Sequence, residues 1–172
     1  MANIKQALGG TAVVTCTLAS IASYASREAT LVNNTVNLYL DSELMVKIQM
    51  SAIPNGDIWV LLSTSVDNTN IAYPATGTDA AIVIPQIDKI GGESPGQFHA
   101  GTDLYVLGRV PCPTSLTATG TVVCNFGSIA AILGGNLTPY WAPVFVNAMT
   151  STFGTTTANH VIWYDGVYAT SV

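Results

Sequence analysis

Apolar and polar residues alternate with a period of two along much of the chain, which is the pattern of β-strands that bury one face. The clearest run is residues 44–51, where Leu, Val, Ile and Met occupy alternate positions and Lys, Gln and Ser follow between them. The turn dipeptide Asn55-Gly56 comes next, and residues 57–65 are then apolar on both faces. We therefore predict a β-hairpin from Leu44 to Ser65.

Further strands are predicted between turn signals rich in Gly, Pro and Asn. These strands are residues 14–18, 36–40, 80–85, 103–110, 120–126, 141–147 and 161–169. One short helical turn is expected from Ser128 to Leu133, with Ser128 as its N-cap and Gly134 after its last residue. Residues 88–102 are predicted to form a long surface loop. Many short strands and almost no helix predict an all-β fold, an antiparallel two-sheet β-sandwich with jelly-roll topology.

The whole chain is predicted to form a single domain. Its 172 residues and 17.9 kDa are the size of one ordinary domain, and no linker or internal repeat divides residues 1–172. Residues 1–10 are a candidate for an extended N-terminal arm, and residues 20–35 are a second candidate for an arm outside the core.

The chain carries unusually little charge. Charged residues make up 9% of the sequence, where about 25% is usual. The formal net charge is −5, and 21 threonines and 12 serines supply uncharged polarity. Residues 110–164 contain no Asp, Glu, Lys or Arg. We interpret this stretch as facing a partner in part, because burying hydroxyl groups costs far less than burying charge. A compact β-domain with a hydroxyl-rich surface is the alternative.

Composition also excludes several classes of protein. The 49% hydrophobic residues exclude a disordered chain, and five cations are too few for a nucleic-acid binder. A membrane-spanning helix needs about 20 predominantly apolar residues. The best candidate, residues 7–26, is interrupted by Gly, Thr and Ser, and residues 110–164 are interrupted by Gly and Pro. We therefore expect neither a nucleic-acid partner nor a membrane partner.

No motif for catalysis or metal binding is present in the sequence. His99 and His160 lie beside no nucleophile motif, and the acidic residues lack the spacing of a calcium loop. The cysteines Cys16, Cys112 and Cys124 include no Cys-x-x-Cys pair, so a zinc site is not expected. Cys112 and Cys124 flank a turn and could form a disulfide, but reduced buried thiols are favoured. The sequence thus predicts no enzyme, no metal and no cofactor.

Aromatic residues fall into two groups. Trp59, Trp141 and Trp163 lie within apolar strands and are predicted to be core residues. Three tyrosines lie near strand ends and could anchor an interface, because a Tyr buries apolar area while it keeps a polar tip. These tyrosines are Tyr140, Tyr164 and Tyr168. A sugar-binding platform is the alternative use of such aromatic residues.

Three segments of the sequence carry a resemblance to a known family. They are the predicted hairpin Leu44–Ser65 with Asp67 and Asn68 after it, the segment Gly134-Gly135-x-Leu137-x-Pro139-x-Trp141, and the segment Val144-x-Val146-Asn147. Together they make the chain similar to virion structural proteins of tailed bacteriophages. The chain most resembles the β-sandwich head decoration proteins, which are also called cement proteins.

The resemblance implies a non-enzymatic protein that binds and stabilises the major capsid protein lattice on the outer surface of the virion, after assembly in the host cytoplasm. It also implies a homo-oligomer, with a trimer expected. We expect the interface to include the uncharged region 110–164 and, in particular, five residues inside or outside it. Those residues are Ile4, Leu8, Tyr140, Tyr164 and Tyr168. The alternatives are a tail-associated receptor- or glycan-binding module, which a Trp or Tyr lining a groove would favour, and a pilus or surface-layer subunit.

Overall fold

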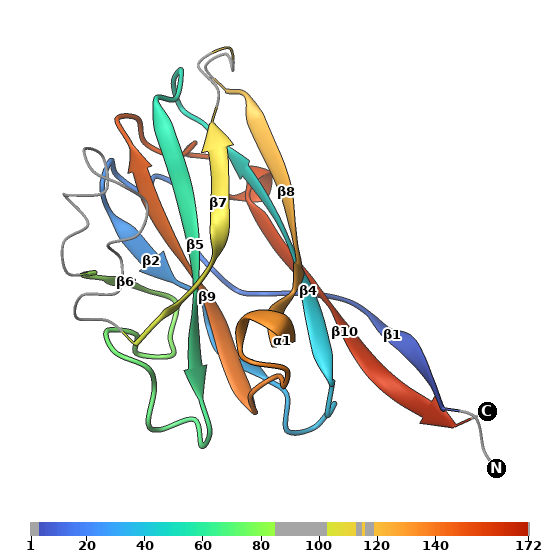
Figure 1. Ribbon diagram of the computed structural model, residues 1–172. Coiled ribbons are helices and arrows are strands. Elements are labelled where there is room, and N and C mark those ends of the chain that lie inside the picture. The colour runs from blue at the N-terminus through green and yellow to red at the C-terminus, as the bar shows by residue number, and fades with distance from the viewer. Residues whose placement is uncertain (1–3, 85–102, 113–114, 116–118, 172) are drawn as a thin grey trace.

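Two antiparallel sheets pack face to face in the computed structural model, which describes residues 4–84, 103–112, 115 and 119–171 (Figure 1). The four-stranded sheet has the order β1-β10-β4-β8, and its strands are β1 (Ile4–Val13), β10 (Val161–Ser171), β4 (Asp41–Gln49) and β8 (Thr121–Ser128). The six-stranded sheet has the order β6-β2-β9-β5-β7, with β3 also paired to β9. Its strands are β6 (Ala80–Ile82), β2 (Ser26–Glu28), β9 (Tyr140–Met149), β5 (Gly56–Ser65), β7 (Tyr105–Cys112) and β3 (Val32–Asn33).

The strand order is that of a jelly roll. Leaving out the short strands β3 and β6, the chain passes from one sheet to the other at every connection except the one between β5 and β7. The eight remaining strands form two sheets of four in the jelly-roll order. The prediction of an all-β, two-sheet antiparallel sandwich with jelly-roll topology is therefore confirmed.

The predicted hairpin from Leu44 to Ser65 is wrong, because its two strands lie in different sheets. Strand β4 pairs with β10 and β8, whereas β5 pairs with β9 and β7. The turn at Asn55-Gly56 therefore connects the two layers. Gly56 has φ +125°, and a Cβ there would lie 2.5 Å from the Ala148 carbonyl oxygen of β9. Glycine is needed at this crossing because only it permits both the backbone conformation and the close approach.

Two further predicted strands are also wrong. Residues 14–18 leave β1 as irregular chain, although Val14 and Leu18 still point into the core. Residues 36–40 form the connection into β4, and the side chains of Val36, Leu38 and Leu40 are exposed. The alternation in this second segment therefore does not indicate a buried face. The loop predicted over residues 88–102 lies outside the described residues.

Neither predicted arm is separate from the domain. Residues 4–10 belong to β1, which pairs with β10 of the same chain. Residues 20–35 include β2 and β3, and they place Ile21 and Ala29 in the core. Backbone pairing holds both segments: β2 and β3 pair with β9 inside the sandwich, whereas residues 4–7 pair with the end of β10, which extends beyond it.

The six-stranded sheet is covered on both faces. Its inner face joins the main core between the sheets, where Trp141 and Phe145 are fully buried. Its outer face carries a second apolar cluster built around Trp59, Leu61 and Val144. Strand β9 is therefore buried on both sides, which explains the absence of charge over residues 140–149 but not over the exposed positions of β8.

The predicted helical turn is confirmed as α1 (Ile129–Ile132). The Ser128 hydroxyl accepts a hydrogen bond of 3.0 Å from the Ala131 backbone N–H, as expected for an N-cap. Gly134 follows with φ +90°. A 3-10 turn, η2 (Thr157–Asn159), precedes β10.

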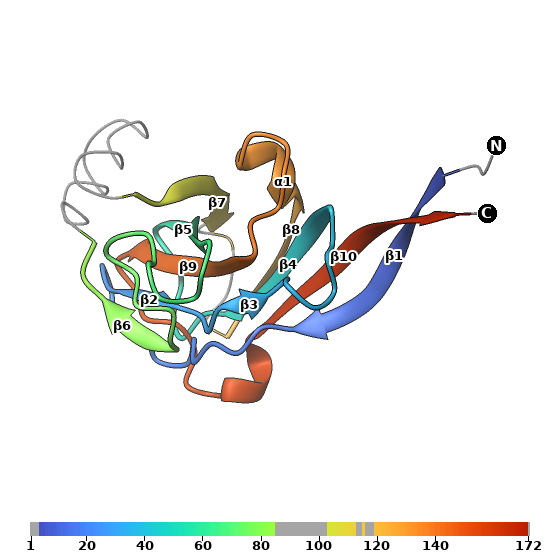
Figure 2. The ribbon, with the colours of Figure 1, turned by 90° about the horizontal axis from the view of Figure 1, so that it is seen from below.

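Strands β1 and β10 extend beyond the sandwich as a two-stranded ribbon (Figures 1 and 2). The pairing of β10 with β4 ends at Val167 and Asp41, whereas its pairing with β1 continues to Ser171 and Ile4. We call residues 4–7 and 168–171 the ribbon. It leads away from both sheets, and the paired residues Ile4 and Ser171 lie at its tip.

The base of the ribbon is held by Tyr39, which lies before β4. Its ring packs against Gly9 of β1 and Gly166 of β10: a Cβ at Gly166 would lie 2.2 Å from Tyr39 Cδ2, and one at Gly9 would lie 2.5 Å from Cε1. These two glycines therefore create the space that the aromatic ring fills, and so fix the direction in which the ribbon leaves the sandwich.

Replacing Gly166 by alanine is expected to displace Tyr39 and to lower the free energy of unfolding by about 2 kcal/mol, because overfilling a packed site forces neighbouring groups to move. Gly127 on β8 provides the matched control, since a Cβ there meets nothing within 4 Å. Urea denaturation of both variants measures the effect. Equal stability of Gly166→Ala and Gly127→Ala would contradict this packing.

Candidate binding surface

The outer face of the four-stranded sheet presents side chains in rows that cross all four strands. One row contains Thr11, Asp165, Glu43 and Ser128, and the next contains Val13, Trp163, Met45 and Asn125. Residues that pair directly across antiparallel strands share a face. Their neighbours Ile162 and Tyr164 point the other way, into the core. The two rows therefore lie on the side away from the six-stranded sheet.

Exposed apolar side chains are frequent on this face. Val13 is 66% exposed, Val123 62% and Met45 41%. Leu8, opposite Val167 at the start of the ribbon, is 64% exposed. The outer face thus combines apolar surface from three strands and continues toward the ribbon. Apolar surface that spans several elements is typical of interaction sites.

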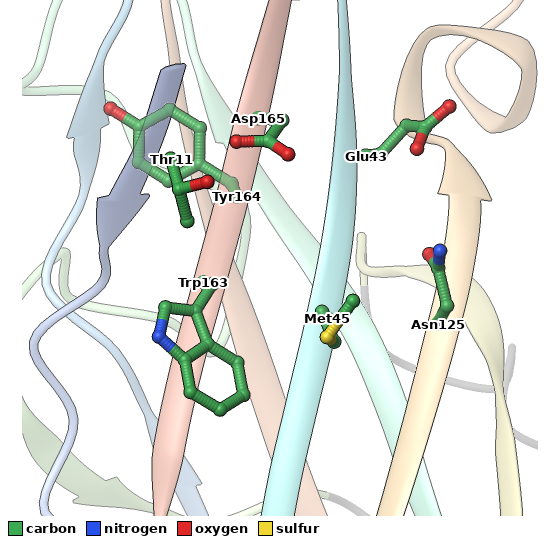
Figure 3. Close-up of a pocket in the computed structure, with 7 residues that line it drawn as sticks. All are labelled: Thr11, Glu43, Met45, Asn125, Trp163, Tyr164 and Asp165. Carbon is green, nitrogen blue, oxygen red and sulfur yellow. The ribbon is translucent and has the colours of Figure 1, made fainter.

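A shallow pocket of about 230 Å³ lies on this face (Figure 3). Seven residues line it: Thr11, Glu43, Met45, Asn125, Trp163, Tyr164 and Asp165. In Figure 3 the Trp163 indole spreads along β10, and Met45 stands between it and Asn125. Asp165 lies two residues further along the same strand, beyond the near end of the indole, and the Glu43 carboxylate points away from Asp165 toward the β8 side. An aromatic surface is thus bordered by polar groups from four strands.

Two carboxylates of this pocket are direct cross-strand neighbours, since Asp165 pairs with Glu43. Like charges in this position destabilise a sheet. Within the described part of the chain, Asp165 Oδ1 is buried and accepts no hydrogen bond. Both arginines are engaged elsewhere: Arg27 Nε lies 2.6 Å from Asp79, and Arg109 Nη1 lies 3.1 Å from Asp57. The fold leaves Asp165 with an unmatched acceptor.

The residues predicted for the interface lie in different places. Ile4 pairs through its backbone with Ser171 near the ribbon tip, and Leu8 is exposed. Tyr168 is half-buried opposite Ala7, and Tyr140 is half-buried at the start of β9. The structure therefore brings Ile4, Leu8 and Tyr168 to the ribbon and its base, and it leaves Tyr140 elsewhere.

Tyr164 is a core residue in the structure, so its expected place at a surface interface is wrong. Only 9% of it is exposed, and its ring meets Trp141 edge to face at a centroid distance of 5.4 Å. Burial raises the pKa of its phenol, consistent with this position. The Tyr164 side chain points inward because it lies on the face of β10 that packs against the six-stranded sheet.

Trp163 was predicted as core but lies half-buried on the outer face, whereas Trp59 and Trp141 are buried as expected. One signal could have indicated this. Trp163 and Tyr164 are adjacent on a strand, so the two side chains must point to opposite faces. The sequence could not show which of them faces inward.

The described histidine and cysteine side chains, which were considered for catalysis, are buried or half-buried. His160 is buried, its Nδ1 accepts a hydrogen bond of 3.3 Å from the Gln49 backbone N–H, and its Nε2 lies 2.8 Å from the Gly154 carbonyl oxygen. Burial lowers its pKa. The three cysteine thiols are free, and burial raises the pKa of Cys16 to about 12 and that of Cys112 to about 11. Such thiols are poor nucleophiles. His99 lies outside the described residues.

Over residues 4–84, 103–112, 115 and 119–171, the acidic, histidine and cysteine side chains form no group of three that could hold a metal ion. Among the same residues, no helix is long and apolar enough to span a membrane. A scan against protein-family models gives no match, and neither a search of curated proteins nor a search of solved structures gives a significant match.

Proposed function

We propose that this chain is a non-enzymatic structural protein of a phage virion, which binds the outer surface of the capsid as a decoration protein. Its partner is the major capsid protein, and it assembles as a homotrimer. The observation that carries the proposal is the ribbon. It extends beyond the sandwich, and among the described strands no third strand pairs with either of its edges.

A two-stranded ribbon is only marginally stable in water by itself. Residues 168–171 pair with β1 but lie beyond the last residue that pairs with β4. A partner that covers the ribbon would stabilise it through added strand pairing and burial of Leu8. Such a contact suits a decoration protein, because each copy attaches to the lattice through a limited surface and the same contact is repeated many times around the shell.

Fold and surface chemistry support the same proposal. The jelly roll occurs in viral capsid domains, although the same architecture serves other functions. The outer face of the four-stranded sheet exposes Val13, Met45 and Val123, and full burial of one such side chain is worth about 1.5–3 kcal/mol. The same face carries the carboxylates of Glu43 and Asp165, so a partner that covers it would have to supply hydrogen-bond donors to them.

Deleting residues 1–10 is expected to abolish attachment to capsid shells of the phage that encodes the chain. The domain should still fold, because Thr11–Val13 keep their pairing with β10. Leu8→Asp should weaken attachment without shortening the chain, since it places a charge on the surface to be covered. Co-sedimentation with purified shells measures attachment, and light scattering measures the oligomeric state.

Val66→Asp is the matched control, because Val66 is 71% exposed but lies in the loop after β5. This variant should sediment with the shells as the unmodified protein does. The proposal fails if the unmodified protein does not attach, or if both ribbon variants attach with undiminished occupancy.

A second candidate function, a tail-associated receptor- or glycan-binding module, is favoured by one observation. Trp163 lines a pocket on the outer face and is bordered by hydrogen-bonding side chains.

A further inference from the structure

We propose that the pocket around Trp163 binds a neutral saccharide, with the ring of one hexopyranose stacked on the indole. This inference deepens the second candidate function and does not rest on capsid attachment. The pocket is small, about 230 Å³, where pockets for drug-sized ligands begin at about 300 Å³. It therefore suits one sugar unit of a glycan whose remainder lies in solvent.

The first argument is the aromatic platform. Trp163 is flanked in its row by Val13 on β1 and Met45 on β4, so its indole is supported on both sides by strands of a rigid sheet. Figure 3 shows the indole lying along β10 on the open side of the sheet. A sugar ring presents C–H groups on one face, and these pack against an indole with little loss of side-chain freedom.

The second argument is the unmatched acceptor of Asp165. Its Oδ1 is buried without a hydrogen-bond donor in the described part of the chain, and such a group costs free energy until a donor arrives. Asp165 lies two residues after Trp163 on the same face of β10, and in Figure 3 its carboxylate stands beyond the near end of the indole, on the side of Thr11. A sugar ring that is stacked on the indole and extends toward Asp165 brings a hydroxyl to this carboxylate, and a rotation of the side chain would turn Oδ1 toward it. Keeping a group poorly satisfied in the free protein is a common cost of binding sites.

The third argument selects a neutral sugar from the possible donors. A basic side chain would also suit Asp165 and Glu43, but the border of the pocket includes Asn125 and Thr11, which donate as well as accept hydrogen bonds. Vicinal sugar hydroxyls satisfy both kinds of group, whereas an ammonium ion offers only donors. The two carboxylates, in turn, repel glycans that carry sialic or uronic acids.

The test uses the isolated protein. Methyl glycosides of glucose, galactose and mannose, together with N-acetylglucosamine, are titrated into isotope-labelled protein, and amide and indole N–H resonances are followed. We expect at least one of these sugars to shift the Trp163 indole signal saturably. Trp163→Ala should weaken its binding about tenfold, which corresponds to about 1.4 kcal/mol, because it removes the flat apolar surface on which the sugar ring stacks.

Asp165→Asn keeps the shape of the side chain and the indole, and it should weaken binding while the fold remains intact by circular dichroism. Tyr105→Ala, which removes a 43% exposed aromatic residue from β7 of the other sheet, should leave binding unchanged.

The inference is overturned if none of the four sugars shifts the Trp163 signal, or if Trp163→Ala binds as tightly as the unmodified protein. It is also overturned if only sialylated glycans or Lys- and Arg-containing peptides titrate at this pocket. If the protein does not attach to capsid shells, the inference that this pocket binds a saccharide is unaffected.

Discussion

Replacing Asn147 by alanine is expected to lower the free energy of unfolding by about 3 kcal/mol, which for a chain of this length corresponds to a fall in Tm of about 6–12 °C. Asn147 is fully buried on β9. Its side-chain amide donates to the carbonyl oxygens of Ile21, Ala22 and Ser151 at 2.9–3.2 Å, and its Oδ1 accepts from the Met149 N–H at 3.2 Å.

The effect is large because one side chain satisfies two irregular segments. The chain near Ile21 and the chain near Ser151 form no regular strand at these points. The Ile21 carbonyl oxygen also accepts from the Phe153 N–H and that of Ala22 from the Ala25 N–H, whereas the Ser151 carbonyl oxygen accepts from the Asn147 amide. Alanine would deprive the Ser151 carbonyl and the Met149 N–H of the Asn147 side chain, and it would remove one of two donors from Ile21 and from Ala22. Unsatisfied buried groups cost about 1–3 kcal/mol each.

Asn147→Asp separates hydrogen bonding from packing. The carboxylate has the same shape but cannot donate to three carbonyl oxygens, so this variant should be at least as destabilised as Asn147→Ala at neutral pH. Asn37→Ala, at an exposed position before β4, should change stability by less than about 0.5 kcal/mol. Urea denaturation compares the three variants. Wild-type stability of Asn147→Asp would contradict the proposed role of the amide.

Replacing Glu28 by alanine is the second change with a large expected effect, about 3 kcal/mol. Glu28 is fully buried on β2. Its carboxylate accepts hydrogen bonds from the backbone N–H groups of Thr76 and Thr78, at 2.7 Å and 3.1 Å, and from the Thr76 hydroxyl. This one side chain ties the segment that precedes β6 to the sheet.

A neighbouring carboxylate completes this attachment. Asp79 accepts from Arg27 Nε at 2.6 Å and from the Thr17 N–H at 3.0 Å. Burial raises the pKa of Asp79, but the hydrogen bonds from Arg27 and Thr17 outweigh it and hold this pKa below its usual value. Loss of Glu28 should therefore release residues 72–78 while Asp79 still holds the end of the segment.

Limited proteolysis combined with urea denaturation tests this expectation. Glu28→Ala should gain a cleavage site within residues 72–78 and lose stability, and Glu28→Gln should lose less, because its amide oxygen can still accept. Asp103→Asn is the control, since Asp103 is exposed. A Glu28→Ala protein that resists both protease and urea as well as the control would show that the carboxylate is not needed to hold the segment.

Local features of the fold could be predicted from neighbouring residues alone. Ser128 and Gly134 determined where α1 begins and ends, because capping depends on groups within a few residues. The alternation from Leu44 onward predicted a half-buried β4, and the doubly apolar residues 57–65 predicted a strand covered on both faces. Strands of these two kinds, with little helix, were sufficient to predict a β-sandwich.

The partner of each strand was decided by the tertiary structure. Periodicity reports how many faces of a strand are buried, but it carries no information about which strand lies beside it. Strands β4 and β5 therefore looked like a hairpin although they belong to opposite sheets. The same limit applies to residues 140–149 of the charge-free region, where burial of β9 on both faces produces the pattern that an external partner would also produce.

The sequence by itself determined that this is an all-β protein with little surface charge and with Trp163 next to Tyr164 on a strand. Only the tertiary structure decided that Tyr164 packs against Trp141 while Trp163 joins Asp165 and Glu43 on the open face. The physical reason is that adjacent residues of a strand face opposite ways, and the choice between the two faces belongs to the long-range packing of the sheets.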